Sequence, residues 1–450
     1  MSGVNLLIQG GRLIDPSQEM DETVDLLIED GRVSKSAKGV KAPAGVETFD
    51  ASGLVVAPGL VDLHTHLREP GQEHKETIRT GTRAAVAGGY TSVCAMANTA
   101  PPNDERAVTE MILAEAARNG ACRVYAIGAV SKGLAGEALA ELADLRAAGC
   151  VAFSDDGKPV SNALLMRRAL EYSKMLGVPI VAHEQDLDLS DGGVMHEGFV
   201  STVLGMRGIP AVSEEVMTAR DVMLTAMTGA HLHVAHISTA GALESVRRGR
   251  QDGVRITCEV APHHIALADE EVRSFSTQLK MNPPLRSEEH RRALIEGIAD
   301  GTIDAIATDH APHHPDEKNV EFDLAPFGVI GLETAFAVCH EVLVAKGKKV
   351  GLARLIDLMS CAPARIFGLP GGTLRKGSPG DVVLLDPAGE TVVALPFQSR
   401  AQNSPFLGRT LRGKVAATFV GGELRWRAAG SAGSSAGPKR KRKAGEKRGR

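Results

Sequence analysis

Between residues 59 and 310 the chain repeats one pattern eight times. A short apolar run rich in β-branched residues is followed by an Ala/Leu/Glu/Arg stretch with helical spacing. Parallel strands joined by crossover helices have this pattern, because helices cover both faces of such a sheet. Eight units over roughly 300 residues predict a (β/α)8 barrel. An open doubly wound sheet is the alternative, but no G-x-G-x-x-G motif supports its dinucleotide-binding form.

The pattern places the elements as follows. The predicted strands are 59–66, 90–97, 123–130, 150–156, 179–184, 231–238, 255–261 and 305–310, and predicted helices between them include 106–119, 136–148, 162–176, 214–228, 240–250 and 288–300.

Both ends of the chain have a different texture from the repeat. Residues 4–57 and 379–426 contain short alternating runs separated by Gly-rich turns, which is typical of β-hairpins. We expect the two segments to pair. The predicted domains are therefore a composite β-sandwich (1–57 and 366–428), a barrel (58–365) and a basic disordered tail (429–450).

Charge and composition exclude several function classes. Residues 430–450 carry eight Lys/Arg and one Glu, a net charge of +7, which leaves −11 for the rest of the chain. An acidic body with 3% aromatic residues is a poor nucleic-acid surface, and the tail is more simply a solvated segment than a polyanion tether. No apolar run is long enough for a membrane span or a secretory signal, so a cytoplasmic location is expected. The six cysteines form no C-x-x-C pair and are expected to be reduced core residues.

Polar residues with metal-binding side chains close the predicted strands. In a barrel these carboxyl ends meet at one mouth, where the active site lies. Imidazole and carboxylate groups together suit Zn²⁺ or a similar divalent ion. The residues concerned are His64, His66, Asn98, Asp155, Asp156, His183, His236, Asp309 and, slightly further on, His313.

The spacing of the histidines separates candidate ligands from packing residues. His64 and His66 are two residues apart, so both point to the same face of a strand and one ion could bind both. Two packed core histidines are the alternative for this pair alone. His231 and His233 share a face and His236 lies on the other, at the strand end. We therefore predict His236 as the ligand and treat His231 and His233 as packed or surface residues.

Several motifs around these residues resemble those of a known protein family. The stretch GLVDLHTHLREPG (59–71) resembles the D-x-H-x-H signature of the amidohydrolase superfamily and, more narrowly, the H-x-H-x-R-x-P-G motif of dihydroorotases. Further resemblances follow in order and, together with the flanking β segments, cover nearly everything except the basic tail. They are AMANTAPPND (95–104), FSDDG (153–157), VAHEQD (181–186), VAHIST (234–239), CEVAPHH (258–264), KMNPPLR (280–286), IATDHAPHHPDEK (306–318) and APFGVIGLETA (325–335). The set is similar to class I (bacterial-type) dihydroorotases.

The resemblance implies two Zn²⁺ ions per subunit, bridged by hydroxide and a carboxylate. His64, His66 and Asp309 would hold one ion, and His183 and His236 the other. Many members of the superfamily use a carboxylated lysine as the bridge, but class I dihydroorotases use an aspartate, and the match falls on Asp156. Asp155, which points to the other face, is the alternative.

The same resemblance implies the reaction and the substrate contacts. The enzyme would interconvert N-carbamoyl-L-aspartate and L-dihydroorotate, the third step of de novo pyrimidine (UMP) biosynthesis, with Asp309 as the catalytic proton carrier. Arg68, two residues after His66, has a planar fork that could bind the substrate carboxylate. The substrate-binding set implied by the match is His66, Arg68, Asn98, Asn282, His313, Phe327 and Gly328.

Two alternatives stay open at this point. One is another cyclic-amide hydrolase, such as a hydantoinase or allantoinase. The other is a catalytically silent dihydroorotase-like partner of aspartate carbamoyltransferase, which the complete set of ligand residues disfavours. Besides a small-molecule substrate, a homodimer and an association with aspartate carbamoyltransferase are considered; no membrane and no specific nucleic acid are expected.

Overall fold

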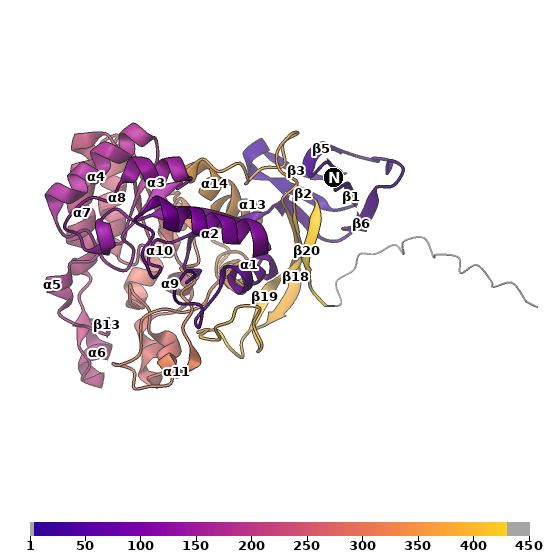
Figure 1. Cartoon of the computed structure of the whole chain (residues 1–450). Coiled ribbons are helices and arrows are strands. Elements are labelled where there is room, and N and C mark those ends of the chain that lie inside the picture. The colour runs from indigo at the N-terminus through magenta and orange to yellow at the C-terminus, as the bar shows by residue number, and fades with distance from the viewer. Residues whose placement is uncertain (1–3, 430–450) are drawn as a thin grey trace, which may run out of the picture.

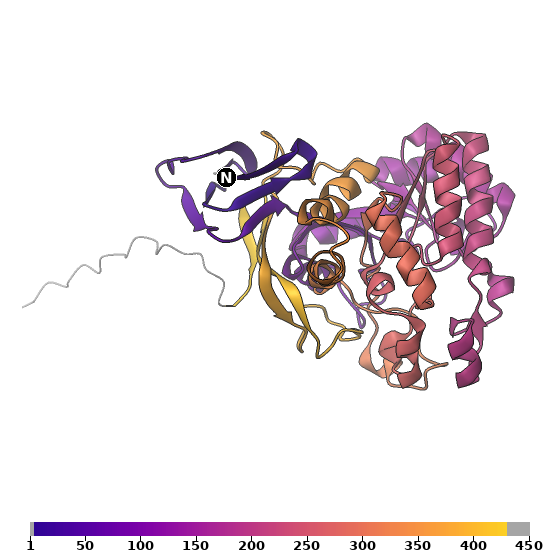
Figure 2. The ribbon, with the colours of Figure 1, turned by 180° about the vertical axis from the view of Figure 1, so that it is seen from behind.

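A computed structural model describes residues 4–429 of the chain. One part is a nearly closed ring of parallel strands surrounded by helices, and the other is a pair of sheets built from both ends of the chain (Figure 1). Seen from behind, the early strands and the last strands again lie together on one side (Figure 2). The predicted fold class, a (β/α)8 barrel with a small β-sandwich from both chain ends, is confirmed.

The barrel sheet contains eight strands in the order β17-β16-β15-β12-β11-β10-β9-β8. Every neighbouring pair is parallel, and a parallel bridge joins Thr65 of the first strand to His310, which lies four residues after the last strand. The ring is therefore nearly closed. Its strands are β8 (Leu60–Thr65), β9 (Tyr90–Ala95), β10 (Arg123–Gly128), β11 (Ala152–Phe153), β12 (Ile180–Ala182), β15 (Leu232–Val234), β16 (Ile256–Val260) and β17 (Ala305–Ile306).

Helices cover the outside of this ring. They are α1 (Ile78–Ala87), α2 (Arg106–Asn119), α3 (Leu142–Ala148), α4 (Ala163–Leu176), α7 (Val212–Thr228), α8 (Ala240–Gln251), α9 (Pro262–Ala266), α10 (Glu288–Ala299), α12 (Ala335–Cys339) and α13 (Leu352–Ile356). A further helix, α14 (Ala362–Phe367), packs instead against side chains from the interior of the barrel. Short elements lie in the long loops that follow β12 and β17. They are α5 (Leu187–Ser190), β13 (Met195–His196), α6 (Phe199–Leu204), β14 (Gly208–Ile209) and α11 (Pro315–Lys318). Local chemistry explains the bounds of α4: the Asn162 side chain accepts hydrogen bonds from the Leu164 and Leu165 amides, and Gly177 ends the helix with a left-handed φ of 70°.

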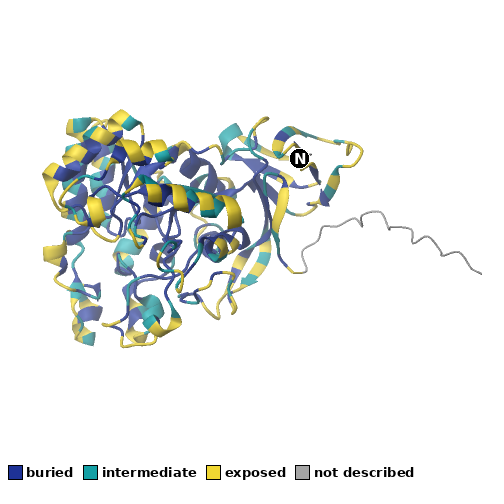
Figure 3. Ribbon diagram, viewed as in Figure 1, coloured by how far each residue is buried: buried dark blue, intermediate teal, exposed yellow. Residues whose placement is uncertain are grey.

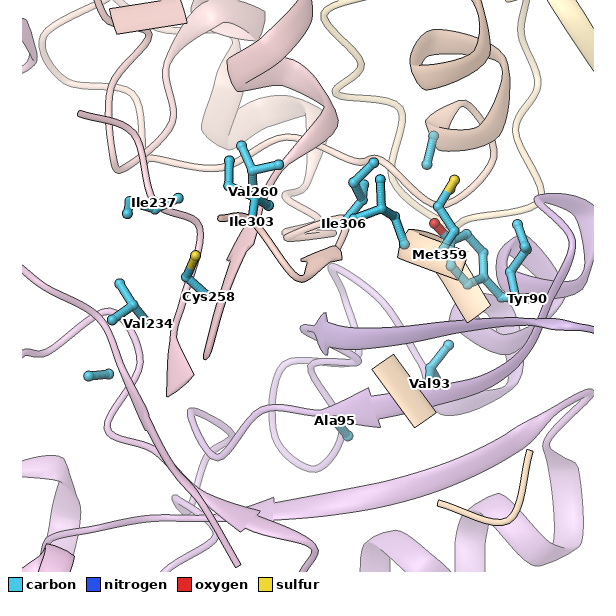
Figure 4. Close-up of a cluster of buried hydrophobic side chains, with 14 of the residues drawn as sticks. Tyr90, Val93, Ala95, Val234, Ile237, Cys258, Val260, Ile303, Ile306 and Met359 are labelled. Carbon is cyan, nitrogen blue, oxygen red and sulfur yellow. The ribbon is translucent and has the colours of Figure 1, made fainter. Parts of the chain in front are cut away.

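The main core lies between the barrel strands and the helices. Val234, Cys258 and Val260 point outward into it and are 0% exposed, together with Val93 and Ile306 from other strands (Figure 4). The helices present exposed residues on their outer faces, whereas most residues of the barrel strands are buried and the rest are half-buried (Figure 3). Because side chains alternate along a strand, the residues between these outward positions point into the barrel.

The small domain consists of two sheets that pack on each other. One has the order β5-β4-β1-β6, and the other has the order β20-β19-β18-β7-β2-β3. In the second sheet β7 pairs with β2 from the N-terminal segment and with β18 from the C-terminal segment, so the chain ends do share a sheet. The strands of the two sheets are β1 (Leu6–Gln9), β2 (Arg12–Asp15), β3 (Met20–Thr23), β4 (Asp25–Glu29), β5 (Arg32–Ala37), β6 (Glu47–Asp50), β7 (Val55–Pro58), β18 (Val382–Val392), β19 (Thr410–Val420) and β20 (Glu423–Arg427).

The predicted positions of all eight barrel strands are confirmed, but several strands are shorter than expected. The sequence predicts a strand over 150–156, and the structure has only Ala152–Phe153. The chain leaves the sheet there because Asp155 accepts hydrogen bonds from the Val130 and Ser131 amides. The predicted helix 136–148 begins only at Leu142, and α1 was not predicted.

The proposed domain boundaries stay predictions, and the predicted basic tail lies outside the described residues from 430 onward. Within 4–429, no helix combines the length and apolar character needed to cross a membrane.

Candidate metal centre at the barrel mouth

The six predicted metal ligands lie together at the carboxyl ends of the barrel strands. His64 belongs to the end of β8, and the others follow the ends of their strands by one to three residues. All six are at most 6% exposed, although every one has a polar or ionisable side chain: His64, His66, Asp156, His183, His236 and Asp309. Burying so many polar groups in one place is costly unless they share partners or an ion.

Asp156 lies at the centre of the group. Its Oδ1 is 3.3 Å from His64 Nε2, 3.2 Å from His236 Nε2 and 3.5 Å from His183 Nδ1. Its Oδ2 is 3.4 Å from His66 Nε2. Two triads of potential ligand atoms result, one with His64 and His66 and one with His183 and His236, and Asp156 belongs to both.

Asp309 lies beside the first triad but is not a member of either. Its Oδ1 is 3.2 Å from His66 Nε2 and 3.6 Å from His64 Nε2. Its backbone has a left-handed φ of 47°, and Arg68 and His236 have φ values of 61° and 30°. Such conformations are uncommon outside glycine and cluster at functional sites, where the surrounding fold holds them.

The hydrogen bonds of the histidine rings leave ligand nitrogens free at the centre. His66 Nδ1 donates to Asn98 Oδ1 at 2.8 Å, which leaves His66 Nε2 facing the two carboxylates. His183 Nε2 donates to Gln185 Oε1 at 3.1 Å, which leaves its Nδ1 facing Asp156. His64 Nε2 is buried and has no hydrogen-bond partner among the described residues. Imidazole nitrogens and carboxylate oxygens arranged in this way fit a divalent metal ion of the Zn²⁺ type.

The neighbouring Asp155 has a different environment. Its Oδ1 accepts hydrogen bonds from the Val130 and Ser131 amides at 2.8 and 3.0 Å, and its Oδ2 accepts one from the Ser131 hydroxyl. No histidine of the cluster contacts it within the described residues. Of the two aspartates left open by the sequence, Asp156 is therefore the one that lies among the histidines.

The local charges favour ionised carboxylates. Burial would raise the pKa of Asp156, but its electrostatic interactions with His64, His183 and His236 together outweigh burial and hold that pKa well below its usual value. Burial opposes ionisation of Asp309 as well, but the contact with His66 and the charges of the surrounding histidines together outweigh burial and lower the pKa. Both groups can therefore serve as anionic ligands at neutral pH.

One group of predicted substrate residues lies beside the first triad. Arg68 is 9% exposed, and its Nε donates to the Pro312 carbonyl oxygen at 3.2 Å. Its two terminal nitrogens have no hydrogen-bond acceptor among the described residues. Burial lowers the pKa of Arg68 to about 10, so the guanidinium stays charged at neutral pH. A buried, forked cation with free donors can bind a carboxylate. The Asn98 side chain accepts from His66 Nδ1 and donates from its Nδ2 to the Asp156 backbone carbonyl oxygen at 3.4 Å.

A second group of predicted substrate residues surrounds the loop after α11. His313 Nε2 donates to the Phe327 carbonyl oxygen at 2.8 Å, and burial lowers the pKa of His313 to about 3. Gly328 has a φ of 130°, and a Cβ there would meet His313 Nε2 at 3.0 Å, so this backbone position suits glycine. Asn282 lies near His183 of the second triad, and its Nδ2 donates to Gln185 Oε1 at 2.7 Å.

Sequence reasoning missed two residues at this site. Gln185 contacts both His183 and Asn282, and its position two residues after a predicted ligand was a usable signal. Glu259 lies inside the barrel, where its two oxygens contact His64 Nδ1 at 3.0 Å and His233 Nε2 at 3.1 Å. Burial would raise the pKa of Glu259, but these two histidines lower it to about 2. Its place in the period-two alternation of β16 indicated an inward direction but no partner.

Known proteins resemble this chain over most of its length. A family model described as dihydro-orotase-like matches residues 53–242. A curated dihydroorotase from Geobacter metallireducens is 52% identical over 422 residues, which cover 94% of this chain and 99% of that protein. A dihydroorotase from Anaeromyxobacter dehalogenans is 53% identical over 422 residues, covering 93% of this chain and 97% of that protein.

Solved structures with the same fold include hydantoinases. An L-hydantoinase (dihydropyrimidinase) from Arthrobacter aurescens superposes with a TM-score of 0.84 at 24% identity, covering 94% of this chain and 96% of that one. A dihydropyrimidinase from Brevibacillus agri has a TM-score of 0.83 at 23% identity, covering 96% of both chains. At these identities the likeness concerns the fold.

Proposed function

The chain belongs to the dihydroorotase family, and from this premise we propose that it catalyses the reversible cyclisation of N-carbamoyl-L-aspartate to L-dihydroorotate with loss of water. This is the third step of de novo pyrimidine biosynthesis. The observation that carries the proposal is the 52% identity to a dihydroorotase over 94% of the chain. The cluster of histidines and carboxylates at the barrel mouth supports it, because active sites of this fold lie there.

We infer that two Zn²⁺ ions occupy this cluster. His64, His66 and Asp309 would hold one ion, His183 and His236 the other, and Asp156 together with a hydroxide would bridge them. When bound, the ions lower the pKa of water and stabilise negative charge on a carbonyl oxygen. Because the bridging position is an aspartate rather than a lysine, we further infer that the chain is of the class I, bacterial type.

Asp309 is the proposed catalytic base and acid. In the hydrolytic direction water adds to the ring amide carbonyl of dihydroorotate, and Asp309 accepts the proton that the attacking oxygen loses. Asp309 then delivers this proton to the ring nitrogen as the carbon–nitrogen bond breaks. The lowered pKa of Asp309 keeps its carboxylate in the ionised form at neutral pH, which is the form that can accept a proton. Cyclisation reverses these transfers and is favoured by acid, because the carboxylate that reacts must be protonated.

Substrate recognition is proposed to depend on Arg68. Its free terminal nitrogens would bind the carboxylate that distinguishes dihydroorotate from simple hydantoins and from dihydrouracil. His66, Asn98 and His313 would complete this side of the pocket. Asn282 and the backbone of Phe327 and Gly328 would hold the amide edge of the ring.

The proposal is tested by comparing three substrates under identical conditions. We expect turnover of dihydroorotate to exceed turnover of dihydrouracil and allantoin, because only dihydroorotate offers a carboxylate to Arg68. Arg68→Lys should raise KM for dihydroorotate by about tenfold or more, since an ammonium cannot form the bidentate contact. Asp309→Asn should lower kcat by about 10²- to 10⁴-fold with the fold intact. Faster turnover of dihydrouracil or allantoin would replace the proposal with a hydantoinase-like or allantoinase-like activity.

Metal analysis distinguishes the enzyme from a silent partner of aspartate carbamoyltransferase. We expect about two zinc ions per purified chain. A chain that holds no zinc and stays inactive after zinc is added would be the silent partner. The homodimer, the association with aspartate carbamoyltransferase and the cytoplasmic location stay predictions.

A further inference from the structure

A line of hydrogen bonds crosses the barrel interior and ends at the proposed metal centre. His231 Nε2 is 2.9 Å from Thr257 Oγ1, and Thr257 Oγ1 is 2.8 Å from His233 Nδ1. His233 Nε2 is 3.1 Å from Glu259 Oε2, and Glu259 Oε1 is 3.0 Å from His64 Nδ1. The line thus connects three strands, β15, β16 and β8, and four of its five residues have no part in the proposed reaction.

The strand geometry directs these side chains inward. Val234, Cys258 and Val260 face the surrounding helices (Figure 4), so the alternating positions His233, Thr257 and Glu259 face the barrel interior. His233 is 0% exposed and Glu259 is 1% exposed. The Phe367 ring packs edge-on against His233, with ring centroids 5.6 Å apart. Bulk water therefore cannot replace a partner that either residue loses.

With neutral imidazole rings, the donors along the line have one consistent direction. A carboxylate accepts hydrogen bonds and donates none, so His64 Nδ1 and His233 Nε2 both donate to Glu259. His233 Nδ1 then carries no proton and accepts from the Thr257 hydroxyl. His64 Nε2 likewise carries no proton when the ring is neutral, and this nitrogen faces Asp156 at 3.3 Å. One carboxylate thereby sets the tautomer of two rings.

We propose that Glu259 is a positioning residue that orients His64 as a metal ligand, and that His233 holds Glu259 in place by binding its second oxygen. The inference rests on the metal centre in the proposed function. Outer partners of this kind fix the ring orientation and the tautomer of a ligand histidine, and their loss typically weakens metal affinity by about 10- to 100-fold. Glu259 touches neither substrate nor reacting atoms, so its effect must pass through His64.

The test measures zinc affinity on metal-free full-length protein by competition with a chelator. Glu259→Gln keeps the shape of the side chain and removes its charge, and we expect it to weaken one of the two zinc sites by about tenfold or more. Glu259→Leu leaves both ring N–H groups without an acceptor and should weaken that site further, if it folds. His233→Leu should have a smaller effect in the same direction.

The double variant Glu259→Gln/His233→Leu should bind zinc about as weakly as Glu259→Gln alone. Because His233 acts only through Glu259, the two effects should not add. In the Glu259→Gln enzyme, saturating zinc should restore most of kcat and leave KM for dihydroorotate unchanged. A merely structural role would instead lower the yield of folded protein and would not respond to zinc.

Glu76→Gln is the matched control. Glu76 is 0% exposed, and its side chain binds Ser399, Thr80 and His310, none of which is a proposed ligand. We expect its zinc affinity to match that of the unmodified protein. Equal zinc affinity in Glu259→Gln and the unmodified protein, or an equal loss in Glu76→Gln, overturns the inference and leaves the proposed function standing. An unmodified protein that binds no divalent metal overturns both.

Discussion

At the scale of single residues, two adjacent aspartates have opposite surroundings. Asp156 lies within 3.5 Å of nitrogens from four histidines. Asp155 instead caps the backbone of Val130 and Ser131. The two side chains have the same chemistry, so only the direction in which each one leaves the backbone separates their roles.

This difference predicts opposite effects of two alanine variants. Asp156→Ala should lose most of the bound metal, because it removes the oxygen atoms that both triads share. Asp155→Ala should keep its metal but lose about 1–3 kcal/mol of unfolding free energy, since two buried amide groups lose their acceptor. Metal content by mass spectrometry and denaturant unfolding measure the two effects. If Asp155→Ala loses its metal and Asp156→Ala keeps all of it, Asp155 is the metal ligand and Asp156 is not.

At the scale of elements, two buried lysines hold the loop that follows α11. Lys318 Nζ donates to the carbonyl oxygens of Lys280 and Pro326 at 3.2 and 2.8 Å. Lys280 Nζ donates to the Asp323 carbonyl oxygen at 2.8 Å and lies 4.8 Å above the Phe327 ring. Since Phe327 and Gly328 are proposed substrate contacts, the lysines shape one wall of the pocket.

The buried Lys318 predicts a pH dependence of stability. Burial lowers its pKa from 10.5 to about 7. Between these values the unfolded chain binds more protons than the folded chain, so the unfolding free energy should rise with pH, by at most about 1.4 kcal/mol per pH unit. Lys318→Met should remove this contribution. Denaturant unfolding at pH 6.5, 8 and 9.5 on both proteins measures the difference.

Lys376→Met is the control for this prediction, because Lys376 is exposed. Its stability should change with pH in parallel with the unmodified protein. If the stability of Lys318→Met changes with pH in the same way as that of the unmodified protein, Lys318 has the same pKa in the folded and unfolded states.

At the scale of the whole molecule, the small domain is attached to the barrel through buried polar contacts. Asp381, which is 3% exposed, accepts hydrogen bonds from Arg123 Nε at 2.7 Å and from the Gly421 amide at 2.7 Å. The Thr418 hydroxyl of β19 donates to the Val86 carbonyl oxygen of α1 at 2.7 Å. The Arg123–Asp381 and Val86–Thr418 contacts each join segments more than 250 residues apart in the chain.

Asp381→Ala should therefore destabilise the whole protein. It leaves the Gly421 amide and a half-buried guanidinium without their acceptor, which should cost about 1–3 kcal/mol of unfolding free energy. Asp21→Ala is the control, because the Arg12–Asp21 pair is also bidentate but its side chains are 55% and 43% exposed. We expect little change there. Thermal and denaturant unfolding compare the two variants, and equal losses would show that burial does not distinguish these ion pairs.

Much of the fold followed from local patterns. The bounds predicted for α2, residues 106–119, match the structure to the residue, because the apolar spacing stops at both ends of this segment. Strand ends were predicted less well: β17 has only Ala305–Ile306 where 305–310 was expected. There Asp309 adopts a left-handed φ, which depends on contacts with His64 and His66 rather than on its own neighbours in the sequence.

The sequence by itself determined the eight strand–helix units, the residue types at the strand ends and the family. Periodicity and motif spacing are local properties, so they can be read along the chain. Only the tertiary structure decided that Asp156, not Asp155, lies among the histidines, and that His233 and Glu259 connect to His64. These outcomes depend on side chains from strands up to 195 residues apart meeting inside a nearly closed ring, where each group must find its partner because water cannot supply one.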